Sequence, residues 1–162
     1  MKKFIAFIPV FALVFSGCIK EPTACIDTFP DSVEVFEDVT FNSSCSENAE
    51  SVEWEYEDIT GGGFFFFPTV STSTSPSFTH NWTSPGDYTI TLTTYSKKEK
   101  EKDVTSSTIT VLDICYECEK SSGGSTSTAS FCSGFYSSLE ELEAEVNDYE
   151  ADGYTCVKKS SI

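Results

Sequence analysis

The chain has 162 residues, with 26 acidic side chains against 10 basic ones and a net charge of −16. This length accommodates one ordinary domain with a small appendage and excludes two large domains. The basic residues are all lysine, and clustered cations are what nucleic acid and anionic lipid headgroups require, so we expect neither as a partner.

The N-terminal segment has the pattern of an export signal. Lysines precede an apolar run from Phe4 to Phe15, and small residues then lead to Cys18. A run of about 12 apolar residues is too short to cross a bilayer, so we predict that residues 1–17 are a signal peptide.

The ending Phe15-Ser16-Gly17-Cys18 resembles the bacterial lipoprotein signal. The resemblance implies that Cys18 carries the lipid, palmitate included, and that residues 18–23 form a tether. It also implies an exported protein, anchored at the outer membrane of a Bacteroidetes-like bacterium and facing the periplasm or the cell surface. The cysteine count agrees, because setting Cys18 aside from seven cysteines leaves six, enough for three disulfides.

Residues 24–113 are predicted to form an antiparallel β-sandwich. Short segments with alternating apolar residues follow one another, separated by turn residues such as Pro85-Gly86. Many short strands without a helical period favour this architecture. The inward positions are expected to be Val33, Val35, Val39, Phe41, Val52, Trp54, Tyr56, Tyr88, Ile90, Leu92, Ile109 and Val111.

Four segments together resemble a PKD domain: "SVEVFEDVTFNSS", "VEWEYED", "PSFTHNWTSPGDYTITLTTYS" and "STITVL". The resemblance implies an immunoglobulin-like fold that serves as a spacer or as a protein-interaction module rather than as an enzyme. It also implies a structural packing role for His80, the only histidine. A small hydrolase would need convergent polar groups that one histidine and no arginine make hard to build, and no Gly-x-Ser-x-Gly motif is present.

The chain departs from the PKD pattern after Trp54, where the family has a short glycine turn. The segment "GGGFFFFPTVSTST" is predicted to be an insertion or an extra edge strand. Alternation along a strand would direct two of the four residues Phe64, Phe65, Phe66 and Phe67 outward. Exposed aromatic rings stack on sugars, so the alternative hypothesis is a carbohydrate-binding module that uses this segment, and the expected partner is an envelope protein or a glycan.

Cys25 and Cys45 flank the first two predicted strands and lie symmetrically about the bend near Val35 to Asp38. An antiparallel pair folded at that bend would bring them together, so we expect a disulfide between them.

Residues 114–162 are predicted to form a small disulfide-stapled ββαβ unit. Apolar residues at helical spacing between Ser138 and Asp152, with Ser137 or Ser138 as the N-cap and Gly153 as the stop, indicate an amphipathic helix. If "SSGG" is a hairpin bend, it sets Cys115 opposite Cys132 and leaves Cys118 for Cys156, although four cysteines allow three pairings.

Two patterns in the chain suggest metal sites. The four C-terminal cysteines suit tetrahedral zinc, but an oxidising compartment favours disulfides. Glu55, Glu57 and Asp58 are a candidate weak calcium site, since like charges on one strand face attract a cation, whereas a solvated face is the simpler account. We therefore expect no cofactor other than weakly bound calcium.

Overall fold

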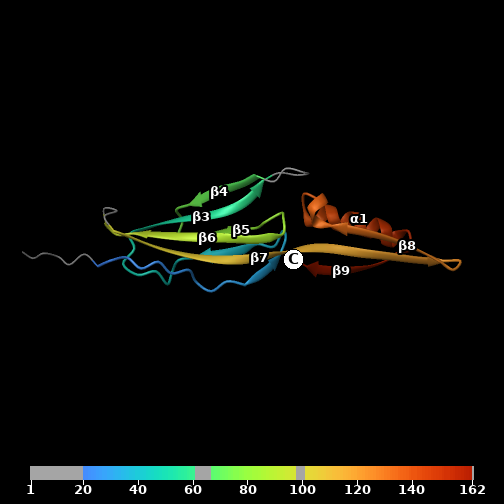
Figure 1. The fold of residues 1–162 in the computed structure, drawn as a ribbon, viewed down its shortest axis with the longest axis horizontal. Coiled ribbons are helices and arrows are strands. Elements are labelled where there is room, and N and C mark those ends of the chain that lie inside the picture. Colours follow the sequence, from blue (N-terminus) through green and yellow to red (C-terminus); the bar gives the residue numbers. More distant parts are fainter. Residues whose placement is uncertain (1–19, 61–66, 98–100, 162) are drawn as a thin grey trace, which may run out of the picture.

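A computed structural model describes residues 20–60, 67–97 and 101–161. The chain is mainly β, with an immunoglobulin-like sandwich followed by a small unit that holds one α-helix, which confirms the predicted fold class (Figure 1). The elements are β1 (Ser32–Glu34), β2 (Val39–Asn42), β3 (Ser51–Thr60), β4 (Phe67–Ser73), β5 (Ser77–His80), β6 (Gly86–Tyr95), β7 (Lys102–Ser122), β8 (Ser125–Cys132), the 3-10 helix η2 (Ser133–Phe135), α1 (Leu139–Ala151) and β9 (Thr155–Ser161).

The sandwich packs a large sheet, in the order β1-β7-β6-β3-β4, against the pair β2-β5. The expectation that the first two strands pair with each other is wrong, because β1 runs parallel to β7 while β2 lies antiparallel to β5 in the other sheet. The chain crosses between the sheets right after β1. There the Val35 N–H donates to Leu112 O, and the next N–H, of Phe36 at φ 66°, donates to Trp82 O.

Aromatic side chains fill the middle of the sandwich. The Phe41 ring contacts Phe78 at 5.2 Å and Trp82 at 6.2 Å between centroids, and it lies 6.4 Å from Trp54. Both indole N–H groups are satisfied, since Trp54 donates to Ser75 O and Trp82 donates to a strand carbonyl of β3, each at 3.0 Å. Eleven of the twelve expected inward positions are buried, and the twelfth, Tyr56, packs half-buried against this core.

Strand β6 carries a buried residue next to an exposed one, so substitutions at the two positions distinguish the core face from the surface face. Ile90 is completely buried, whereas Thr89 is exposed on the opposite face of the same strand. We expect Ile90→Ala to lower the free energy of unfolding by about 2–5 kcal/mol, because it removes buried methylenes and leaves a cavity. Thr89→Ala should change it by about 0.5 kcal/mol or less in urea denaturation. Equal losses for the two variants would contradict this assignment of faces.

The stretch after Trp54 forms the extra edge strand that its sequence indicated. β3 runs on to Thr60 and returns as β4, with Thr60 paired to Phe67, and β4 is the last strand of the large sheet. Phe64, Phe65 and Phe66 lie outside the described residues, as does the side chain of Phe67.

The C-terminal unit is a three-stranded sheet, β8-β7-β9, with α1 on one face. Leu142 and Val146 are the buried residues of the helix. The Ser138 hydroxyl accepts from the Glu141 N–H at 3.2 Å and so caps the helix, as the sequence predicted. Gly153 follows the helix at φ 88°, a conformation that favours glycine.

Candidate functional site

The junction between the sandwich and the C-terminal unit is formed by strand β7, which belongs to both sheets. Its first half pairs with β6 and β1, and its second half pairs with β8 and β9. The boundary expected between residues 113 and 114 therefore falls inside a continuous strand. The backbone hydrogen bonds of both sheets hold this one strand, so no linker separates the two units.

A second contact closes the junction on the β1 side. Glu34 pairs with Leu112, and Ser161 of β9 pairs with the next residue, Asp113, so the ends of β1 and β9 meet along β7. The Glu34 carboxylate accepts from Lys158 Nζ at 2.5 Å and from the Ser160 hydroxyl. These hydrogen bonds join residues more than 120 positions apart and tie the C-terminal strand to the sandwich.

The electrostatics of this contact follow from its partners. Hydrogen bonds from Lys158 and Ser160 hold the pKa of Glu34 below its ordinary value of 4.5. The hydrogen bond to Glu34 raises the pKa of Lys158 above 10.5. Both side chains are partly exposed, so we treat the pair as a positioning contact and not as a large source of stability.

The lowered pKa of Glu34 makes the junction sensitive to acid. The stabilisation that the Glu34 contact provides is present above pH 4.5. It is lost as the pH falls through the lowered pKa of Glu34 in the folded protein, because the carboxyl group is then protonated. We expect amide hydrogen exchange in β9, measured over the range from about pH 3 to pH 7 and corrected for intrinsic rates, to accelerate at the acidic end. Glu34→Gln should remove this pH dependence of exchange, whereas Glu55→Gln, a control at an exposed position of β3, should retain it. Unchanged pH dependence in Glu34→Gln would contradict the role of this contact.

All three expected disulfide pairings are present: Cys25–Cys45, Cys115–Cys132 and Cys118–Cys156. The first forms for a reason other than the one anticipated. The segment before β1 runs beside β2, where the Asp27 N–H donates to Asn42 O and Thr23 bridges to Glu47. The other two join directly opposite residues of β7 with β8 and of β7 with β9, so the four-thiolate zinc site does not form.

The glutamates of β3 point to the outer face of the large sheet. Glu55 and Glu57 are exposed there and line a shallow hollow of about 130 Å³ with Val70 and two threonines of β6. Within the part of the chain that the structure describes, they belong to no group of three potential metal ligands, and the side chain of Asp58 lies outside it. Calcium binding stays a prediction.

The predictions for His80 and for the segment from Phe64 to Phe67 have different outcomes. His80 packs its ring 4.7 Å from Tyr56 and 4.7 Å from Trp82, which agrees with the structural role expected of it. The carbohydrate-binding hypothesis rests on Phe64 to Phe67, which lie almost entirely outside the described residues, so it stays a prediction.

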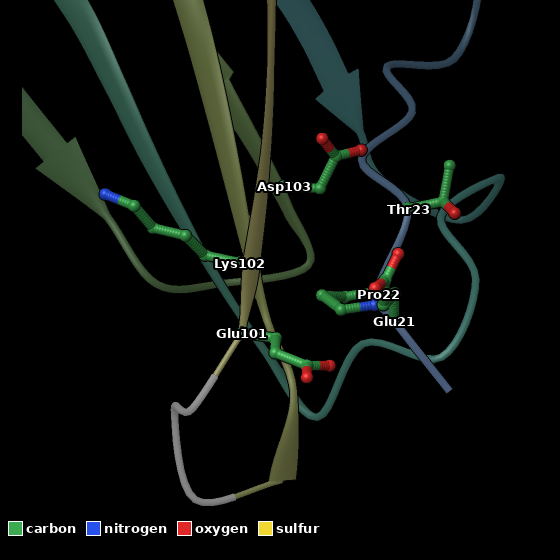
Figure 2. Close-up of a pocket in the computed structure, with 6 residues that line it drawn as sticks. All are labelled: Glu21, Pro22, Thr23, Glu101, Lys102 and Asp103. Carbon is green, nitrogen blue, oxygen red and sulfur yellow. The ribbon is translucent and has the colours of Figure 1, made fainter. Parts of the chain in front are cut away.

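A hollow of about 480 Å³ lies at the end of the sandwich where the described chain begins (Figure 2). Three of its six lining residues are acidic, and Figure 2 shows the Lys102 side chain directed away from Pro22. Asp103 anchors the incoming segment, because its carboxylate accepts from the Ala24 N–H at 2.8 Å. Segment 20–24 is therefore tied to the first residues of β7.

No local pattern in the sequence indicates the contacts at the junction. Glu34, Lys158 and Ser160 look like ordinary surface residues of strands, and no local motif links them. Their role arises because β1 and β9 happen to meet along β7, which is a property of the strand order. Among the described residues, no helix has the length and apolar character needed to cross a membrane.

These features define an immunoglobulin-like β-sandwich whose last strand extends into a second sheet. The family model of the PKD domain matches residues 20–111, more than half of the chain, so the protein belongs to the PKD domain family. The match ends inside β7, just before the C-terminal unit begins. A comparison with curated proteins finds no match.

Proposed function

We propose that this protein is a lipid-anchored, non-enzymatic protein of the bacterial cell envelope, in which the PKD domain is a rigid spacer that presents the C-terminal unit to an envelope partner. The observation that carries the proposal is the continuity of β7 through both sheets. A flexible linker would let the terminal unit move independently, whereas a shared strand fixes its distance and its orientation.

The dimensions support a spacer. β7 has 21 residues and spans about 65 Å at the usual rise of a β-strand. Its first residues hold segment 20–24 through Asp103, and its last residues form the hairpin with β8. Figure 1 shows the start of the described chain and this hairpin at opposite ends of an elongated molecule. A lipid on Cys18 would therefore place the hairpin far from the membrane.

The anchor rests on the N-terminal sequence. The short apolar run ending at Cys18 has the form of a lipoprotein signal, and the six other cysteines are all consumed by disulfides, which leaves Cys18 available. The net charge of −16 does not favour attachment to an anionic membrane surface through side chains. A covalent lipid supplies the membrane affinity that the side chains lack.

Lipidation can be tested directly in a Gram-negative host. We expect the protein to incorporate labelled palmitate and to fractionate with the outer membrane, because the Cys18 thiol accepts the lipid after export. Cys18→Ala should lose the label and the membrane association, while Glu21→Gln, a control in the tether, should keep both. A soluble wild-type protein, or a palmitate label that survives in Cys18→Ala, would refute the anchor.

The spacer can be tested by small-angle X-ray scattering on the Cys18→Ala protein. A compact domain of this size has a radius of gyration of about 15 Å, whereas a rod built along β7 should give about 20 Å or more. Ile90→Ala, which affects the core and not the outline, should scatter like the parent when folded. A radius near the compact value would contradict the spacer while leaving the lipid anchor unaffected.

A further inference from the structure

We propose that the Cys115–Cys132 disulfide can be reduced in the folded protein, and that the resulting dithiol binds a thiophilic divalent cation such as Zn²⁺ with Asp113 as the third protein ligand. One carboxylate oxygen of Asp113 and the two sulfurs lie within 4.8 Å of one another. Among the described residues, this is the group of three potential ligands that lies close enough to share one ion.

The β-ladder positions the three ligands without help from the disulfide. Cys115 and Cys132 are direct partners in the β7-β8 register, with Cα atoms 4.0 Å apart. Asp113 precedes Cys115 by two positions, so its side chain leaves the same face of β7. The pair stands at the end of the β7-β8 ladder, and the backbone pairing that continues from Tyr116–Phe131 to the hairpin would keep the two thiols adjacent after reduction.

The Asp113 carboxylate is already directed toward the sulfurs. One of its oxygens accepts a hydrogen bond from the buried hydroxyl of Ser133, the residue that follows Cys132. Its other oxygen lies 3.5 Å from the Cys115 sulfur. A metal-binding carboxylate is commonly oriented by such a neighbouring donor.

The two disulfides of the C-terminal unit differ in access to a reductant. Cys118 is three positions from Cys115 and therefore lies on the opposite face of β7, where it is completely buried with Leu142 of α1. Cys115 and Cys132 are half-buried on the face that α1 does not cover. The buried Cys118 has a half-buried partner, Cys156, so this disulfide has one accessible cysteine where Cys115–Cys132 has two. Thiol–disulfide exchange requires an attacking thiolate to reach a sulfur atom, so a dithiol reductant should reach Cys115–Cys132 first.

A dithiol can supply the electrons and protons that the reduction of Cys115–Cys132 requires. The dithiol transfers two electrons and two protons, the S–S bond of Cys115–Cys132 breaks, and the reductant leaves as its own disulfide. Metal binding then displaces both thiol protons. Zn–S bonds of about 2.3 Å separate two thiolates by about 3.8 Å, which directly opposed cysteines can reach.

The ligand set selects the class of metal. Two thiolates and one carboxylate suit Zn²⁺ or Cd²⁺ and do not suit Ca²⁺ or Mg²⁺, which prefer oxygen ligands. Three protein ligands also leave a fourth tetrahedral position open to water or to a group from a partner. Lys159 pairs with Cys115 across the β7-β9 ladder, and its ammonium offsets part of the added negative charge.

The experiment uses the full chain in detergent, treated with limiting dithiothreitol, alkylated and mapped by mass spectrometry. We expect the first two thiols at Cys115 and Cys132. After anaerobic removal of the dithiothreitol, titration with Cd²⁺ should produce a sulfur-to-cadmium charge-transfer band with one ion per chain. Early alkylation of Cys118 or Cys156, or the absence of this band, would overturn the proposal.

Substitutions at Asp113 test how much the carboxylate contributes to Cd²⁺ binding apart from the two thiols. Asp113→Asn should weaken Cd²⁺ binding at least tenfold because it removes an anionic ligand, and Asp113→Glu should restore part of the affinity. Glu119→Gln, at an exposed position on the same face of β7 and outside the Lys159–Glu117 ion pair, is the matched control and should bind like the parent. Circular dichroism verifies that each variant is folded, and a folded Asp113→Asn that binds Cd²⁺ as tightly as the parent would refute the role of Asp113.

Discussion

The continuity of β7 is the constraint on which the rest of the structure depends. One strand supplies hydrogen bonds to β1 and β6 in its first half and to β8 and β9 in its second half. Fewer than fifty residues could bury only a small core by themselves, and the C-terminal unit avoids that limit by using a strand already fixed in the sandwich. Its stability is therefore coupled to that of the PKD domain.

The two faces of the C-terminal sheet have different physical roles. On one face α1 buries Leu142 and Val146 and covers the Cys118–Cys156 disulfide, and the Phe131 ring meets Tyr149 edge to face. The other face carries Cys115–Cys132 among charged residues and hydroxyl groups, with the Lys159–Glu117 ion pair beside it. The covered face holds the unit together, and the uncovered face is available for chemistry or contact.

Charge and shape together limit what the protein can bind. The net charge of −16 is the basis for the expectation that the protein binds no polyanion. The PKD domain is an immunoglobulin-like, non-catalytic module. The molecule is elongated, and the hydrogen bonds of Glu34 with Lys158 and Ser160 tie β9 to the sandwich at the junction.

Local physics in the sequence determined the elements and most of the core. Alternation placed Trp54 and Ile90 inward, a serine cap and Gly153 bounded α1, and the hairpin bend set Cys115 opposite Cys132. The tertiary structure alone decided that β1 joins β7 and not β2, and that β7 continues past residue 113. Strand order, the Glu34 contacts and the approach of Asp113 to two sulfurs depend on pairings between distant residues, which no local pattern encodes.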